Sequence, residues 1–138
     1  MGELFAVVSG KGGTGKTSLC AALATALSRE GKRVLCIDCD VGLRNLDISL
    51  GLSECGALSF WDVSEGVYSL EDAFRHPVYP TLAFLTAPMN CPVEKIDAAA
   101  FREMLGRARQ LYDYVFLDAP AGVDAGFRLA AQFADRLL

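Results

Sequence analysis

The sequence lacks several features that define whole classes of proteins. It contains no hydrophobic stretch long enough for a transmembrane helix, and its first residues, Met1-Gly2-Glu3, lack the basic and apolar regions of a signal peptide. It shows no internal repeat, low-complexity tract or linker. These absences predict a cytoplasmic address for this part of the chain.

Clusters of basic residues are also absent. The 13 lysines and arginines are scattered along the chain and are outnumbered by 17 aspartates and glutamates, which gives a formal net charge of −4. Domains that bind nucleic acid usually gather lysines and arginines on one face. The sequence therefore gives no support for direct DNA binding.

Histidine occurs once and cysteine five times. The odd number of cysteines favours reduced thiols over a disulfide framework. Cys36 and Cys39 spell C-x-x-C, but residues three apart on a strand point to opposite faces, so we do not expect them to share a metal unless the chain turns between them. We interpret Cys20 and Cys36 as small buried hydrophobic residues, and His76 as a structural loop residue.

A glycine-rich segment near the amino terminus carries the strongest functional signal. Residues 10–17, G-K-G-G-T-G-K-T, match the P-loop pattern G-x-x-x-x-G-K-[ST]. Glycines allow successive backbone N–H groups to approach phosphates closely. The segment connects a predicted buried strand over 4–8 to a predicted helix over 17–30, whose amino terminus then faces the anion. The sequence predicts a nucleotide site.

The residues of this segment have expected roles. Lys16 is expected to reach the β- and γ-phosphates, and the Thr17 hydroxyl to ligate Mg²⁺. Lys11 is a second lysine that the pattern does not require, and phosphates, in its own site or a partner's, are the nearest strong anions. The residues expected to bind the nucleotide are Gly10, Lys11, Gly12, Gly13, Thr14, Gly15, Lys16, Thr17 and Ser18.

Aspartates follow two further predicted strands. The apolar run 34–37 leads into Asp38 and Asp40, and the run 114–117 leads into Asp118. Ligands of open α/β sheets bind at the carboxyl ends of the strands, and a strand-end aspartate such as Asp118 holds Mg²⁺ in P-loop proteins. Each aspartate also has a plainer interpretation, as a loop cap, a turn residue and a helix N-cap respectively.

The remaining segments predict a scaffold. A strand is expected over 81–85, a helix capped by Asp97 with an apolar stripe between residues 101 and 112, and short helices starting at Ser59 and Ser69. Alternating strands and helices predict an α/β fold, a P-loop NTPase with a mostly parallel β-sheet and helices on both faces, in three α/β/α layers.

Together these motifs resemble the MinD/ParA family of P-loop ATPases, and most closely its MinD branch. K-G-G-T-G-K-T is similar to the family's deviant Walker A motif, in which the additional lysine, here Lys11, reaches the nucleotide of the other subunit. The run 38–47, D-C-D-V-G-L-R-N-L-D, is similar to switch I of the MinD branch. The run 118–122, which ends at Gly122, is similar to switch II.

The resemblance implies an ATPase that binds Mg·ATP, forms an ATP-dependent homodimer and hydrolyses ATP slowly to ADP as a switch. Lys11, Lys16 and Asp40 are its implied catalytic residues, with Asp40 orienting the attacking water. Asp38, Asp40, Asp118 and Gly122 belong to the implied switch segments. The implied biological role is placement of the division septum, through a regulatory protein partner and reversible membrane binding.

The chain is expected to be the amino-terminal part of one such domain, 1–138, truncated at its carboxyl side. Residues 126–134 are typical of a further helix, and 135–138 of the opening of a further strand. By resemblance, the adenine-recognising loop and an amphipathic membrane helix would follow Leu138. Membrane contact would then depend on a segment absent here, and a cytoplasmic full-length protein with peripheral attachment to the inner membrane face stays open.

Two other functions stay open. One is a partition, cargo-positioning or flagellar-number ATPase of the ParA type, against which the G-L-R-N-L-D run speaks. The other is a non-catalytic carrier of a metal or cluster that uses nucleotide only to change shape. Bound iron without ATP turnover would favour the carrier.

Overall fold

The computed structural model describes residues 2–7, 14–39, 58–86, 96–118 and 134–137, with only the backbone of 14–19 and 136–137. The described strands form one sheet in the order β3-β4-β2-β5-β1-β6. All neighbours pair in parallel except β3 and β4, which are antiparallel. The strands are β1 (Glu3–Val7), β2 (Val34–Asp38), β3 (Phe74–Arg75), β4 (Leu82–Leu85), β5 (Tyr114–Asp118) and β6 (Arg136–Leu137).

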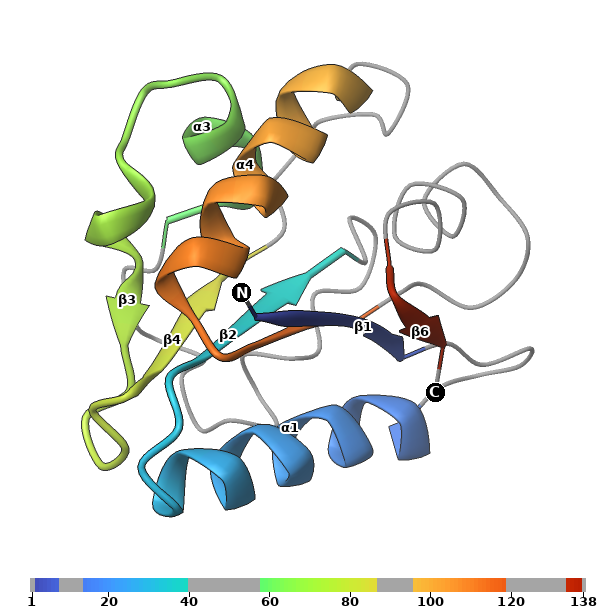
Figure 1. Cartoon of the computed structure of the whole chain (residues 1–138), viewed down its shortest axis with the longest axis vertical. Coiled ribbons are helices and arrows are strands. Elements are labelled where there is room, and N and C mark those ends of the chain that lie inside the picture. Colours follow the sequence, from blue (N-terminus) through green and yellow to red (C-terminus); the bar gives the residue numbers. More distant parts are fainter. Residues whose placement is uncertain (1, 8–13, 40–57, 87–95, 119–133, 138) are drawn as a thin grey trace.

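Helices cover both faces of this sheet (Figure 1). Helix α1 (Thr14–Arg29) lies on one face, and α3 (Phe60–Ser64) and α4 (Ala98–Leu111) lie on the other. A 3₁₀ turn, η1 (Leu70–Asp72), precedes the edge strand β3. The three-layer α/β/α architecture predicted from the sequence is confirmed.

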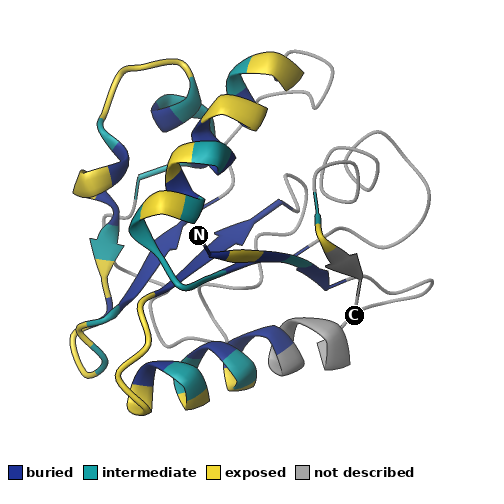
Figure 2. Cartoon of the chain, in the orientation of Figure 1, coloured by how far each residue is buried: buried dark blue, intermediate teal, exposed yellow. Residues whose placement is uncertain are grey.

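The central strands are hydrophobic because they are buried on both faces (Figure 2). Alternate residues of β2 pack in opposite directions: Val34 and Cys36 join the cluster beneath α1, and Leu35 and Ile37 join the cluster beneath α4. A strand with one solvated face would alternate between apolar and polar residues instead. The continuous apolar runs thus follow from the layered fold.

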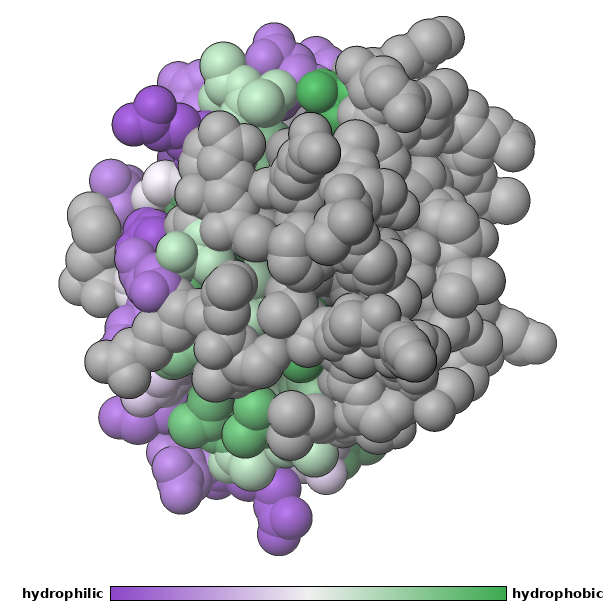
Figure 3. Space-filling view, turned by 90° about the vertical axis from the view of Figure 1, so that its right-hand side faces the viewer, coloured by the Kyte–Doolittle hydropathy of each residue, from purple (hydrophilic) through white to green (hydrophobic). Residues whose placement is uncertain are grey.

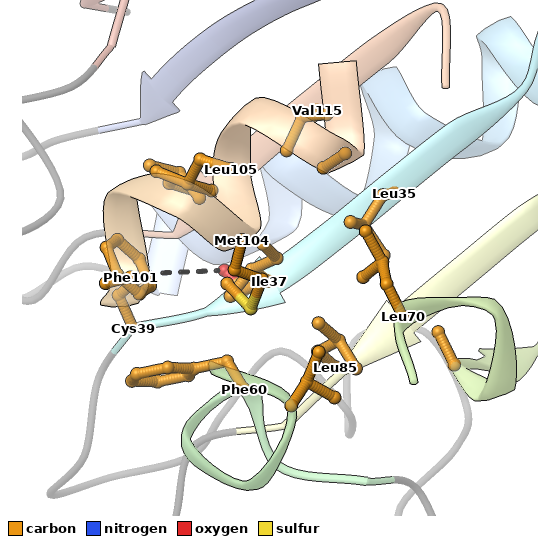
Figure 4. Packing of buried hydrophobic residues seen from close by; sticks show 14 of the residues in the cluster. Leu35, Ile37, Cys39, Phe60, Leu70, Leu85, Phe101, Met104, Leu105 and Val115 are labelled. Carbon is orange, nitrogen blue, oxygen red and sulfur yellow. Dashed lines mark hydrogen bonds between the residues drawn. The ribbon is translucent and has the colours of Figure 1, made fainter. Parts of the chain in front are cut away.

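The α4 side of the core is organised around two aromatic rings. Phe60 of α3 and Phe101 of α4 are fully buried and meet edge to face, with their centroids 5.3 Å apart (Figure 4). The predicted helix cap is confirmed: the Asp97 carboxylate accepts hydrogen bonds from the amides of Ala99 at 2.9 Å and Ala100 at 3.4 Å. The apolar stripe that follows Asp97 packs in the hydrophobic core, as predicted.

Other predicted helix signals are confirmed with small differences. Gly31 directly follows the predicted helix over 17–30, and it ends α1 with φ of +86°, a left-handed conformation that favours glycine. The Ser59 hydroxyl accepts a hydrogen bond from the Asp62 amide at 3.1 Å and so caps α3. Ser69 begins only the 3₁₀ turn η1, where its hydroxyl accepts from the Glu71 amide at 3.4 Å.

Three other differences concern element boundaries and the edges of the sheet. Helix α1 begins at Thr14, three residues before the predicted start, inside the P-loop pattern. Strand β3 was not predicted, because two residues are too few to show a periodicity. Strand β6 confirms the strand expected over 135–138, whereas the helix expected over 126–134 lies almost wholly outside the described residues. Within the described part, no helix is both long and apolar enough to cross a bilayer.

His76 has the structural role expected of it. Its side chain is 9% exposed, and Nδ1 accepts hydrogen bonds from the backbone amides of Val78 at 3.0 Å and Tyr79 at 3.3 Å. The ring thus holds the turn between β3 and β4.

Candidate nucleotide-binding site

The carboxyl ends of three neighbouring strands form one edge of the sheet. In the register of the parallel pairs, Asp118 at the end of β5 lies opposite Asp38 of β2 on one side and opposite Val7 of β1 on the other. The prediction that Asp38 and Asp118 reach the same edge is confirmed. This is the edge where open α/β sheets bind ligands.

Both aspartates are buried, with Asp38 0% and Asp118 1% exposed. The amide of Cys39 donates a hydrogen bond to the backbone carbonyl of Asp118 at 3.0 Å, which ties the two strand ends together. Burying carboxylates is costly unless a charge or hydrogen-bond donor compensates them. Oxygen-rich carboxylate groups are also the ligands that Mg²⁺ prefers, so the donor chemistry at this edge fits a magnesium-bound phosphate.

Helix α1 begins beside this edge. It starts at Thr14, on the side towards which β1 and β2 run (Figure 1), so its amino terminus lies at the carboxyl edge. The first N–H groups of a helix have no partner within the helix and attract anions. The backbone of Thr14, Gly15, Lys16, Thr17 and Ser18 forms this first part of α1. Figure 3 shows the molecule from the right-hand side of Figure 1. Among the described residues in that view, hydrophobic ones lie near the bottom of the molecule, at the level where Figure 1 places α1.

Two cysteines pack in the core cluster between α1 and the sheet. Cys20 of α1 and Cys36 of β2 are fully buried, and a hydrogen bond with Cys36, burial and the nearby charges of Asp118 and Asp38 raise the pKa of the Cys20 thiol well above its usual value. Cys39 belongs to the opposite core cluster, where its thiol donates to the Ile37 carbonyl at 3.9 Å. The two cysteines of C-x-x-C therefore point to opposite faces, as predicted, and the buried-hydrophobe interpretation of Cys20 and Cys36 is confirmed.

One buried polar residue at this edge was missed by sequence reasoning. Thr86 follows β4, is 5% exposed and forms a parallel bridge with Ser59. Its amide donates to the Leu58 carbonyl and its carbonyl accepts from the Phe60 amide, each at 2.9 Å. The polar residue directly after the predicted strand 81–85 was the available signal. Thr86 anchors the start of α3 to the end of β4.

Several predicted site residues lie outside the described part of the chain. They are Gly10, Lys11, Gly12, Gly13, Asp40 and Gly122. For these residues, the expected roles stay predictions.

The sequence was also compared with known families. The model of the CobQ/CobB/MinD/ParA nucleotide binding domain matches residues 5–131, most of the chain. The chain belongs to this family. The family match spans both the glycine-rich segment and Asp118.

Relatives in the family share the resemblance over the full length of this chain. The septum site-determining protein MinD of Thermotoga maritima is 38% identical over 139 residues, which cover 100% of this chain and 51% of the relative. MinD of Bacillus subtilis is 36% identical over 140 residues, covering 100% of this chain and 52% of the relative. The resemblance to the MinD branch is confirmed, and the chain spans about half the length of these relatives.

Solved structures show the same fold. The MinC:MinD cell division protein complex of Aquifex aeolicus superposes with a TM-score of 0.84 at 37% identity, covering 98% of this chain and 54% of that one. MinD of Pyrococcus horikoshii, solved with Mg-ADP, superposes with a TM-score of 0.82 at 31% identity, covering 99% and 56%.

Proposed function

We propose that this chain is the nucleotide-binding part of a MinD-type switch ATPase, which binds Mg·ATP, dimerises around it and hydrolyses it slowly. One observation carries the proposal: two buried aspartates, Asp38 and Asp118, lie side by side, and Asp118 is also next to the strand that leads into the P-loop sequence. Two buried carboxylates at this position can hold a cation that is bound together with a phosphate.

Different residues have different proposed roles in nucleotide binding and in hydrolysis. The first-turn amides of α1 and the Lys16 ammonium bind the phosphates, and Thr17 and Asp118 hold the cation, with Asp118 acting through water. Mg²⁺, when bound, offsets phosphate charge. Asp40 orients the attacking water, Lys11 contacts the phosphates of the other subunit, and Asp38 supports the switch segment. Hydrolysis by such a site depends on positioning and on charge stabilisation.

The proposed biological role is placement of the division septum. The support is the similarity to septum site-determining proteins and to the MinC:MinD cell division protein complex, which points to a regulatory protein as partner. The proposed reversible attachment to the membrane would use a segment outside this chain. These statements concern a longer protein, because this chain spans about half the length of these relatives.

Nucleotide binding is the step to test first. Lys16→Ala removes a charge that water cannot replace at the phosphates, so we expect ATP binding to weaken by about 2–4 kcal/mol, measured by calorimetry. Lys32→Ala is the matched control, because Lys32 is an exposed lysine in the turn after α1. Equal ATP affinity in folded Lys16→Ala and Lys32→Ala proteins would refute the phosphate-binding role.

A further inference from the structure

A cavity opens near the amino ends of β2 and β4, away from the carboxyl edge that carries Asp38 and Asp118. It has a volume of about 350 Å³, and its lining includes Arg33, directly before β2, and Thr81, directly before β4. Asp38 lies at the other end of β2, five residues along from Arg33 and about 16 Å away at the rise of an extended strand. The cavity is therefore separate from the candidate nucleotide site.

Two arginines, Arg33 and Arg75, line this cavity. Arg75 lies on the edge strand β3 opposite Ala83, which also lines the cavity, and none of the described carboxylates forms an ion pair with Arg75. Arg33 contacts Asp113 at 3.3 Å, but both side chains are largely exposed, at 57% and 40%, and such surface pairs contribute little. Both arginines thus have donors to offer a ligand.

One carboxylate, that of Glu71, belongs to a residue that lines the same cavity. Glu71 accepts a hydrogen bond from the Arg107 guanidinium at 2.8 Å through Oε1 and from the Ser69 hydroxyl at 2.5 Å through Oε2. Two arginines and one glutamate line the cavity, so the charged residues of its lining carry a net positive charge.

Tyr112 and Leu111 form the wall at the end of α4. Burial raises the pKa of the Tyr112 phenol, the positive charge of Arg75 lowers it and the negative charge of Glu71 raises it, so that the pKa lies above the ordinary value of a tyrosine. The phenol is therefore protonated at neutral pH and can donate a hydrogen bond. Its ring and the Leu111 side chain give the cavity an apolar surface beside the arginines.

We propose that this cavity binds a small organic carboxylate, with the anion held by Arg75, Arg33 and the Tyr112 hydroxyl and an apolar body against Leu111 and the Tyr112 ring. An arginine fork fits a carboxylate with two parallel hydrogen bonds, and a desolvating wall strengthens them. The volume of about 350 Å³ is within the range of small-molecule sites. The site belongs to the scaffold edge and does not depend on the proposed function.

Paired ligands test the proposal directly. Hexanoate and hexanamide have the same apolar body and differ in charge, so titration of the isotope-labelled chain should give saturable amide shifts at Arg75, Ala83 and Tyr112 with hexanoate only. Arg75→Gln should weaken hexanoate binding about tenfold or more, because a charge-assisted bidentate contact is lost. Arg102→Gln is the matched control, since Arg102 is exposed on α4 and does not line this cavity.

The same titrations can also contradict the proposal. Equal shifts with hexanamide, absence of saturation with hexanoate, or unchanged binding in Arg75→Gln would each overturn the proposal. Inorganic phosphate that binds as tightly as hexanoate would overturn the choice of an organic carboxylate. Tyr112→Phe keeps the ring and removes only the hydroxyl, so it should weaken binding several-fold even if Arg75→Gln fails to fold.

Discussion

Asp38 and Asp118 stand opposite each other at the ends of the parallel strands β2 and β5, and both side chains are buried. Strand β5 inserts between β1 and β2, although it follows both in the sequence. Asp118 thereby lies between the strand that leads into the P-loop sequence and the strand that carries Asp38. The strand order creates this acidic edge.

Asp118→Asn should separate ATP binding from its dependence on magnesium. The amide keeps the shape of the carboxylate but loses the charge that supports a divalent cation, so the gain in ATP affinity on adding Mg²⁺ should fall about tenfold or more. The measurement is ATP affinity with Mg²⁺ and with a chelator. Asp72→Asn, at an exposed aspartate of η1, is the control and should keep the full gain. A full gain in Asp118→Asn would remove Asp118 from the metal site.

Phe101→Ala should destabilise the α4 side of the core. Phe101 is fully buried and packs edge to face against Phe60, so truncation should lower the free energy of unfolding by about 3–5 kcal/mol in urea titrations. Arg102→Ala, at the neighbouring exposed position, should change it by less than about 0.5 kcal/mol. Similar losses in the two variants would mean that α4 does not dock through Phe101.

Much of this scaffold could be predicted from local sequence signals. Strands β2, β4 and β5 are apolar runs buried on both faces, and Asp97 and Gly31 mark helix ends through side-chain and backbone chemistry that acts within a few residues. The order of the strands could not be predicted in this way, because pairing depends on contacts between distant segments. Strand β3 could not be predicted because its two residues, which pair with β4, are too few to show a periodicity.

The candidate site was predictable to the extent that it depends on strand ends. Asp38 and Asp118 each follow an apolar run directly, so their edge could be inferred without knowing their neighbours. Thr86 was missed because its role depends on the bridge with Ser59, a partner 27 positions away by residue number. The cavity lined by Arg33, Arg75 and Tyr112 has no sequence motif, because these residues come from three separate segments.

Lys11→Ala should lose ATP-dependent dimerisation and hydrolysis together in a full-length protein. The proposed target of Lys11 belongs to the other subunit, so each monomer should keep much of its nucleotide affinity. Sedimentation with a slowly hydrolysed ATP analogue, beside calorimetry on the same sample, checks both expectations. If the variant still dimerises, Lys11 acts in its own site and the proposed contact across the dimer is wrong.

Asp40→Ala should separate ATP binding from hydrolysis. Asp40 follows the end of β2 by two residues in the segment similar to switch I, where a carboxylate can order a water in line with the γ-phosphate. The nucleotide is proposed to be held by other groups, the Lys16 ammonium and the first amides of α1. Asp40→Ala is therefore expected to bind ATP with nearly the parent affinity.

Its turnover should be slower by about a hundredfold or more, the usual contribution of a positioned acid–base group. A phosphate-release assay on the full-length protein measures this rate, with binding followed by calorimetry. Asp40→Asn is the matched variant: it keeps a hydrogen-bond acceptor but loses the charge, so its rate should lie between those of the parent and Asp40→Ala. Hydrolysis at the parent rate in Asp40→Ala would show that another group orients the water, while weakened ATP binding would instead place Asp40 among the groups that hold the nucleotide.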